Sequence, residues 1–333
     1  MGFRNWFYIY CPLPRVDSRV LFCPKVNDNS QSLNGYHRSA WIRWLLIVLV
    51  NISGLFASAA WAQLYWDTNS TTAGAGATPS ATWSTSGGTT KKWSTSSAGT
   101  VATANWTSGS DAVFSAGTDA INAYTVTVSG TQNVSSITVE EGSPTLATGT
   151  INFNDASPDI TVASGSTLTF GVAPTSSSTN GLNITNQSGT AKTVFSASTT
   201  LTGTVNLGGG TLQLGGTSYT FGTLNLTGNS TIDFAGATTL NLTTLNLNGF
   251  TLSITSWIAA SDFFYTANWT GATPNVMGSA PMNLVTFNGF TAAQTGWDSF
   301  DNQIRPNVPE PATYGVVLIG GMMAFFAWRR RRA

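Results

Sequence analysis

Charged side chains are scarce in this chain of 333 residues, because Asp, Glu, Lys and Arg together make up only 8% of it. Soluble globular domains carry about 25% charged residues, so something other than charge must keep this chain soluble. From Gln63 to Asp301 that role falls to Ser, Thr, Asn and Gly, which bind water through hydroxyls, amides and exposed backbone. The sequence therefore predicts a polar but uncharged surface.

Cysteine and histidine are nearly absent. Cys11, Cys23 and the single histidine, His37, all precede the signal-peptide cleavage point that is predicted below. The mature chain would then have neither residue type, which excludes disulfides, thiol nucleophiles, His-assisted triads and zinc sites with imidazole or thiolate ligands. We therefore expect no cofactor, no metal and no enzyme activity.

Basic residues are also sparse in the interior, since ten of the fourteen lie in the two end segments. From Gln63 to Val308, four bases stand against eleven acids, which gives this body a net charge of −7. Nucleic-acid binding requires clustered Lys and Arg, so the acidic body argues against a nucleic-acid partner.

An apolar segment near the N-terminus has the regions of a secretory signal peptide. Residues 44–56 form its core, with Arg38 and Arg43 in front of it. The core is shorter than the ~18 residues expected of a spanning helix, which favours a cleaved signal over an uncleaved anchor. We assign the signal to residues 38–62 and leave residues 1–37 unassigned, as an extended n-region or the result of a start codon placed too early.

Small residues end this signal in the pattern that signal peptidase accepts. They are Ala60 and Ala62, on either side of a tryptophan. We expect cleavage after Ala62, so that Gln63 begins the mature chain.

The C-terminus carries a second tripartite signal. Pro309, Glu310 and Pro311 precede 17 uncharged residues, 312–328, and four arginines follow: Arg329, Arg330, Arg331 and Arg332. The apolar segment is marginally long enough for a membrane helix, and the arginines would hold the C-terminus in the cytoplasm with the body outside. A simple membrane anchor is the alternative, but it needs only the arginines and not the Pro-Glu-Pro motif.

This order of motif, apolar span and basic cluster, over residues 309–333, resembles the PEP-CTERM sorting signal of Gram-negative bacteria. The resemblance implies that an exosortase-type membrane protease recognises Pro309, Glu310 and Pro311 and removes the tail, with Arg329 to Arg332 as the stop-transfer element. It also implies secretion through the inner membrane and delivery of the body to the cell surface or extracellular matrix. Signal peptidase and, transiently, the inner membrane would be further partners.

Between the two signals the sequence predicts strands, because apolar and small polar residues alternate over short runs with Gly, Asn and Ser between them. In the central stretch three short strands recur about every twenty residues. Near-identical peptides mark the phase at 203–207, 222–226 and 243–247. This repeat favours a right-handed parallel β-helix with three strands per coil and eight to ten coils from about 120 onward, over the alternative of an antiparallel β-sandwich.

Asparagine recurs at one position of these repeats, in Asn206, Asn225 and Asn246. In stacked coils these side chains would align as an amide ladder, which Asn183 and Asn152 could extend. The glycine-rich run at 208–216 resembles the Gly-Thr-Leu repeats of β-helical autotransporter passenger domains, although this chain lacks their C-terminal barrel.

The segment 63–110 is rich in Ser and Thr, and we expect it to be loosely ordered apart from its tryptophans, Trp66, Trp83, Trp93 and Trp106. We interpret these as packing residues rather than sugar platforms, with Trp106 and Trp269 covering the two ends of the core. The β-repeat body then covers 111–300, and a linker at 301–308 leads to the sorting tail.

Four acids are candidates for a catalytic pair, but their positions argue against one. Glu140 and Glu141 are adjacent, so on a strand they would point to opposite faces, and Asp155 and Asp159 border a proline as turn residues do. The sequence therefore predicts an exported structural or adhesive surface protein that is not an enzyme. The alternative is a secreted polysaccharide-binding protein or hydrolase on a β-helix scaffold, so extracellular polysaccharide is a candidate partner.

Overall fold

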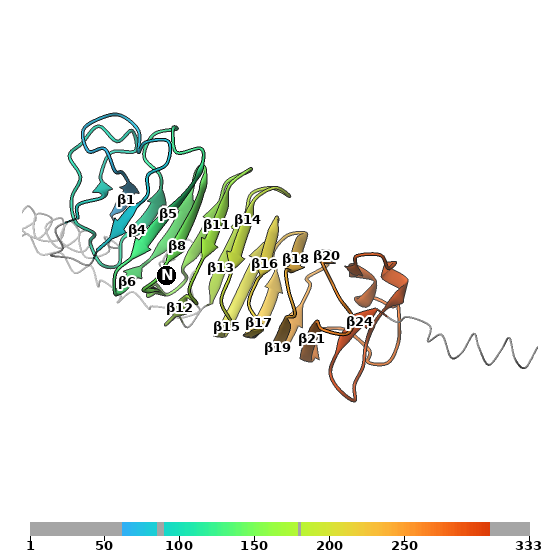
Figure 1. Cartoon of the computed structure of the whole chain (residues 1–333). Helices are drawn as coiled ribbons and strands as arrows, with labels where there is room; N and C mark the ends of the chain where they lie inside the picture. The colour runs from blue at the N-terminus through green and yellow to red at the C-terminus, as the bar shows by residue number, and fades with distance from the viewer. Residues whose placement is uncertain (1–61, 85–89, 179–180, 307–333) are drawn as a thin grey trace, which may run out of the picture. The chain divides into compact units, whose positions relative to one another are not determined.

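A computed structural model describes residues 62–84, 90–178 and 181–306 of the chain. These residues form an all-β solenoid whose strands stack coil upon coil (Figure 1). No helix within the described ranges is long and apolar enough to cross a membrane. The two segments from which we predicted a signal peptide and a membrane span lie outside these residues, apart from Ala62 at the end of the signal.

Two long sheets form two sides of the solenoid. The first, called sheet A here, has ten strands and the second, sheet B, has nine. In order along sheet A the strands are β21 (Phe263–Trp269), β19 (Thr239–Asn246), β17 (Ser218–Leu226), β15 (Thr199–Gly208), β13 (Leu182–Asn186), β10 (Asp159–Val162), β7 (Ser136–Val139), β4 (Asp111–Phe114), β1 (Gln63–Trp66) and β3 (Trp93–Ser94). In order along sheet B they are β2 (Ala81–Trp83), β5 (Ala123–Val128), β8 (Ser143–Ala147), β11 (Thr167–Phe170), β14 (Lys192–Phe195), β16 (Thr211–Leu214), β18 (Ser230–Phe234), β20 (Leu252–Thr255) and β22 (Val285–Phe287).

A short third sheet, sheet C, completes the early coils. It consists of β6 (Thr131–Val134), β9 (Thr150–Phe153) and β12 (Thr175–Ser176). In the later coils this third side runs directly into sheet A, so β15 and β17 are long strands with an irregular register between Leu201 and Thr204. Outside the sheets lie two 3-10 turns and one hairpin: η1 (Met282–Leu284), η2 (Ala292–Gln294), β23 (Thr295–Trp297) and β24 (Ile304–Pro306).

Every pair of neighbouring strands in sheets B and C is parallel, and in sheet A only β3 runs antiparallel to its neighbour. Each coil therefore bonds to the same side of the next coil, which rules out the antiparallel sandwich and confirms the predicted parallel β-helix. The solenoid has about seven turns.

The coils differ in length. Asn206 pairs with Asn225 and Asn225 with Asn246, so these coils have 19 and 21 residues, as the repeat predicted. Asp159 pairs with Asn183 and Asn183 with Asn206, so the preceding coils have 24 and 23 residues. Because these coils are longer than twenty residues, the solenoid has fewer turns than the eight to ten that we expected.

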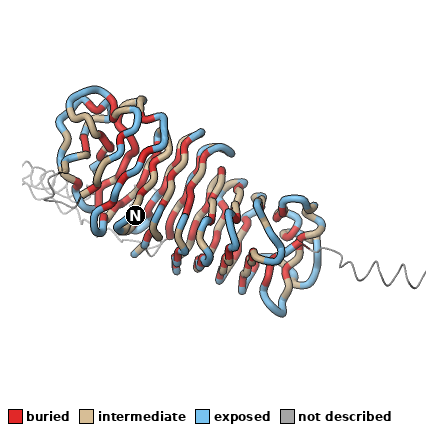
Figure 2. The backbone as a smooth tube through the Cα atoms, viewed as in Figure 1, coloured by how far each residue is buried: buried red, intermediate tan, exposed pale blue. Residues whose placement is uncertain are grey.

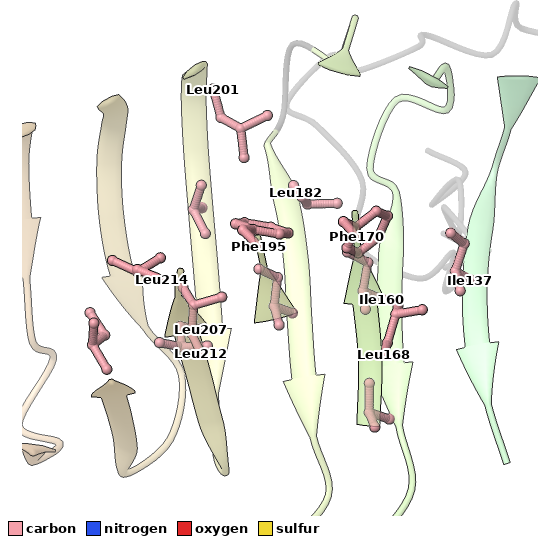
Figure 3. Close-up of a cluster of buried hydrophobic side chains, with 14 of the residues drawn as sticks. Ile137, Ile160, Leu168, Phe170, Leu182, Phe195, Leu201, Leu207, Leu212 and Leu214 are labelled. Atoms are coloured by element: carbon pink, nitrogen blue, oxygen red, sulfur yellow. The ribbon is translucent and has the colours of Figure 1, made fainter. Parts of the chain in front are cut away.

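The core lies between the sheets and follows from the alternation of the strands. In β5 (AYTVTV) every second residue is buried, and β7, β9, β10, β11 and β16 repeat the pattern. Figure 2 shows buried positions alternating with intermediate ones along most of the stacked strands. Inward leucine, isoleucine and phenylalanine side chains from successive coils, such as Leu168, Phe170, Phe195 and Leu214, form one continuous core (Figure 3).

An aromatic cluster closes the N-terminal end of this core. Trp66, Trp83, Trp93 and Trp106 are all buried together with Phe114. The Trp83 ring lies 4.7 Å from that of Trp93 and 4.8 Å from that of Trp106, in geometries that aromatic pairs favour. The segment from Gln63 to Ser110 thus contributes β1, β2 and β3 to the sheets. Our expectation of a loosely ordered segment was wrong, because four tryptophans supply the apolar area that its composition lacks.

Trp269, the tryptophan that we placed at the opposite end, lies at the end of β21. It continues the inward row of Leu224 and Leu245, and the Trp297 ring covers it with a centroid separation of 6.3 Å. The matching peptides around Trp106 and Trp269 therefore both contribute to closing the core, although only the second is part of a strand.

Asp67 is a fully buried carboxylate beside the aromatic cluster. Its Oδ1 accepts hydrogen bonds from the backbone N–H groups of Asn69 (2.9 Å) and Ser70 (3.1 Å). Its Oδ2 is buried without a hydrogen-bond partner among the described residues. Burial raises the pKa of this carboxyl, and the two backbone bonds only partly oppose the rise.

We predict a pH-dependent effect of Asp67→Asn. The folded state binds the Asp67 proton more tightly than the unfolded chain, so stability from this group is present at low pH and is lost as the pH rises through the folded pKa. The side-chain amide of the variant would keep an oxygen that accepts the two backbone hydrogen bonds of the turn. Because this amide does not ionise, the variant would not lose stability as the pH rises. The melting temperature of the variant relative to the wild type is therefore expected to rise between about pH 4 and pH 7. Asp155→Asn, at an exposed turn, is the control, and an equal difference at both pH values would contradict the prediction.

Candidate functional site

Only two of the residues predicted to direct processing lie within the described ranges. Ala62 and Gln63 are both exposed, and Gln63 is the first residue of β1. The Ala62 carbonyl accepts a hydrogen bond from the backbone N–H of Asp111 (3.1 Å). Ala60, Pro309, Glu310, Pro311 and Arg329 to Arg332 lie outside the described residues. The roles of all these residues in cleavage and sorting stay predictions.

The two adjacent glutamates have different surroundings. Glu141 is half-buried, and its Oε1 accepts hydrogen bonds from the Ser115 hydroxyl (3.1 Å) and the Ala120 N–H (3.0 Å). Glu140 is exposed, and partial desolvation, followed by the charge of Glu141, raises the pKa of its carboxyl. Glu141 therefore holds the loop that contains Ser115 and Ala120, whereas Glu140 is exposed to solvent.

The two aspartates near Pro158 have different environments. Asp155 lies in a turn, where its Oδ1 accepts the Ser157 N–H (2.9 Å), as predicted. Asp159 is the first residue of β10 and not a turn residue, because its backbone pairs with Asn183 of β13. Over the described ranges, no group of three or more His, Cys, Asp or Glu residues is placed to hold a metal ion.

A ladder of amide side chains crosses the outer face of sheet A. Asn248 donates to Asn225 (2.7 Å), Asn225 to Asn206 (2.9 Å) and Asn206 to Asn183 (2.6 Å). Asn183 then donates to the Asp159 carboxylate (2.8 Å), where the ladder ends. We call these five residues the amide ladder. It confirms the predicted stacking of Asn183, Asn206 and Asn225 over successive coils.

The ends of the ladder differ from the sequence prediction. Asn246 pairs with Asn225 through the backbone, but the side chain that bonds Asn225 belongs to Asn248, in the left-handed conformation of a turn. Asn152 lies in β9 of sheet C and donates to Asn133 (2.8 Å), so it does not extend the ladder. Sequence reasoning missed Asp159, although Asp-Ile-Thr at 159–161 matches Asn-Ile-Thr at 183–185.

A shallow groove follows the turns between sheets A and B. Its volume is about 340 Å³, and every residue along it is uncharged: Asn186, Gln187, Ser188, Gly189, Gly209, Gly210, Asn229, Ser230, Thr231, Thr251 and Ser253. Gly210 is structural, because it has a φ of +51° and a Cβ there would lie 2.3 Å from the Asn186 Cβ. We call this hollow the turn groove, and its hydroxyl and amide groups suit neutral polar ligands.

A second hollow, of about 260 Å³, lies at the C-terminal end of the solenoid. Its lining consists of Asn275, Met277, Gly296, Trp297, Asp298 and Arg305. Arg305 pairs with Asp298 (2.7 Å) and Asp301 (3.1 Å), and these are the two ion pairs among the described residues. Both aspartates lie on the turn of the β23–β24 hairpin, so the ion pairs fix the last strand before the tail.

The residues that follow this hairpin match a family model. The model describes the PEP-CTERM protein-sorting motif, and it matches residues 307–332. This chain carries a PEP-CTERM sorting signal. The match covers the Pro-Glu-Pro sequence, the apolar segment and the four arginines, as the resemblance predicted. Comparison with curated proteins and with solved structures gave no match.

The PEP-CTERM motif identifies the chain as an exported protein that an exosortase, a membrane protease, processes. The sorting signal is anchored in the membrane before it is removed. Together with the fold, this describes a β-solenoid that is exported with a C-terminal sorting signal, which is removed after export.

Proposed function

We propose that the exported solenoid is a structural and adhesive protein of the cell surface or extracellular matrix, and that it is not an enzyme. The observation that carries the proposal is the amide ladder, a regular row of asparagine donors and acceptors on an outer face that ends at the Asp159 carboxylate. Such groups match the hydroxyls of a neutral polysaccharide without the cost of removing ions from water. The parallel sheets hold their spacing fixed, so a chain with repeating hydroxyls can make several equivalent contacts at once.

The surroundings of the candidate acids also support a binding role without catalysis. Glu141 and Asp155 hold a loop and a turn, and Asp159 ends the amide ladder. Cleavage of a glycosidic bond needs two carboxyl groups on either side of one bond, and these three carboxylates have other tasks. Among the four candidate acids, the exposed Glu140 therefore has no second carboxylate with which to form a catalytic pair.

The proposal can be tested in the producing cells by deleting the gene and complementing the deletion strain with variants of the protein. A variant with Asn183, Asn206 and Asn225 changed to Ala is expected to retain several-fold less protein in the matrix fraction and to restore cell aggregation poorly. The matched control changes Thr125, Thr145 and Thr169 to Ala, because these residues form an aligned row on the outer face of sheet B.

Urea unfolding of both purified variants shows whether poor aggregation arises from a lost surface contact or from a less stable fold. Equal aggregation in the deletion strain and the wild type would contradict the adhesive role. Release of reducing sugars from a panel of glycans by the purified processed protein would contradict the absence of catalysis.

A second candidate function, supported by the turn groove, is the binding of a single polysaccharide chain along successive turns. Replacing Thr231 and Ser253 by Val and Ala would remove two hydroxyls from the lining of the groove. Co-sedimentation with insoluble neutral polysaccharide would then fall, while the triple Asn variant of the ladder would bind normally. The opposite pattern would assign the contact to the ladder.

A further inference from the structure

Three exposed apolar side chains lie on two joined segments at the C-terminal end of the solenoid, the end that precedes the sorting tail. Phe300 is 97% exposed at the turn of the β23–β24 hairpin, and Met277 and Val276 are 49% and 43% exposed on the preceding loop. The Asn275 side chain joins the two segments, since it donates to the Ser299 hydroxyl (2.7 Å) and accepts the Ser299 N–H (3.1 Å). We call Val276, Met277 and Phe300 the apolar rim.

The apolar rim is costly in water, because it leaves a large aromatic ring almost wholly solvated. Nothing in the core requires Phe300, whose neighbours on the hairpin are polar. The hairpin itself is rigid, since Arg305 bonds Asp298, Asp301 and Gln303, and the Trp297 indole N–H donates to the Thr266 carbonyl (3.1 Å). A large aromatic side chain that a fixed hairpin holds out in solvent indicates a contact surface.

The position of the sorting tail points to the occupant of this surface. β24 ends at Pro306, and the apolar segment of the PEP-CTERM signal begins at Ala312. Six residue steps span at most about 20 Å even when fully extended. While the tail is anchored, the C-terminal end of the solenoid is therefore held within that distance of the membrane surface.

We propose that the apolar rim contacts the lipid interface of this membrane until the tail is removed. Asp298, Asp301 and Arg305 leave a net charge of −1 beside the rim, so the contact does not depend on anionic lipid. A single ring at an interface binds weakly, but the short tether gives it a high effective concentration. Cleavage removes the tether, and the contact alone is then too weak to hold the protein at the membrane. The proposal rests on the anchored sorting signal and is independent of the adhesive role.

A single environment-sensitive label tests this contact. The full chain, with Cys11 and Cys23 changed to Ser, contains no other cysteine, so Phe300→Cys can be labelled alone with the fluorophore NBD. The uncleaved protein would be expressed in a bacterial host without exosortase and placed in phosphatidylcholine nanodiscs. Ile121→Cys is the matched control, because Ile121 is also an exposed large apolar residue and lies in the N-terminal coils.

The expected result is a shift of the NBD emission to shorter wavelength at position 300, with several-fold weaker quenching by aqueous iodide than at position 121. Cutting the tail by a protease site inserted after Pro306 should return the emission at position 300 to that in water. Identical spectra at the two positions in nanodiscs would overturn the proposal. A shift that occurs only when exosortase-containing membranes are added would also overturn it, because the contact would then be with a protein.

Discussion

Replacing Trp83 by alanine is expected to lower the free energy of unfolding by about 3–5 kcal/mol, the range for large aromatic residues in cores. Trp83 is fully buried between Trp93, Trp106 and Phe114, so its removal would leave a cavity at the N-terminal end of the core. The cluster is also what orders the segment before Asp111, so its loss would expose β1 to β3. Urea unfolding followed by tryptophan fluorescence measures the first effect, and limited proteolysis within residues 63–110 measures the second.

The control for this prediction is Val101→Ala, at a position that is 47% exposed in the same segment. It should change the unfolding midpoint little, because surface substitutions usually stay within about 0.5 kcal/mol of the wild type. If Trp83→Ala and Val101→Ala had equal midpoints, the aromatic cluster would not be the element that closes the core.

Gly222→Ala is expected to destabilise the solenoid by about 1–3 kcal/mol, because it forces a methyl group between two stacked coils. A Cβ at this position would lie 2.1 Å from the Thr202 carbonyl oxygen and 2.7 Å from that of Gly203. Both contacts are with backbone of the preceding coil, at the irregularity between Leu201 and Thr204, and the paired residues on either side restrain its movement. The measurement is the urea midpoint of the purified variant.

Gly236→Ala is the matched control, because a Cβ at Gly236 would meet nothing within 4 Å. The same change of residue there adds a methyl group to open space. An equal loss of stability in both variants would show that the effect does not arise from the packing of the coils.

The strands of the solenoid could be predicted from the sequence because side chains on a strand alternate between two faces. The inward pairs Leu212 and Leu214, Ile232 and Phe234, and Leu252 and Ile254 are all buried in sheet B, as predicted. The parallel stacking followed from the near-identical peptides at 203–207, 222–226 and 243–247, since only stacked coils bring such repeats into register. Asn206, Asn225 and Asn246 are paired in that register.

The two ends of the solenoid could not be predicted in the same way. Trp66, Trp83 and Trp93 lie in a segment whose Ser and Thr content is typical of disordered chains, and their association depends on contacts across tens of residues. The C-terminal hairpin has no repeat to reveal it, so sequence reasoning assigns part of it to a linker that begins at residue 301. Asn248 could not be recognised in the ladder because its contact depends on the left-handed backbone of a turn.

The amide ladder has a direction. In each bonded step the Nδ2 of one asparagine faces the preceding coil and its Oδ1 faces the following one, from Asn248 to Asn183. The side-chain dipoles therefore add head to tail, and their positive ends point toward Asp159, whose carboxylate accepts the last bond. The row therefore ends on a full negative charge of the sign that these dipoles favour, so Asp159 closes the amide row as an acidic side chain closes the N-terminus of a helix.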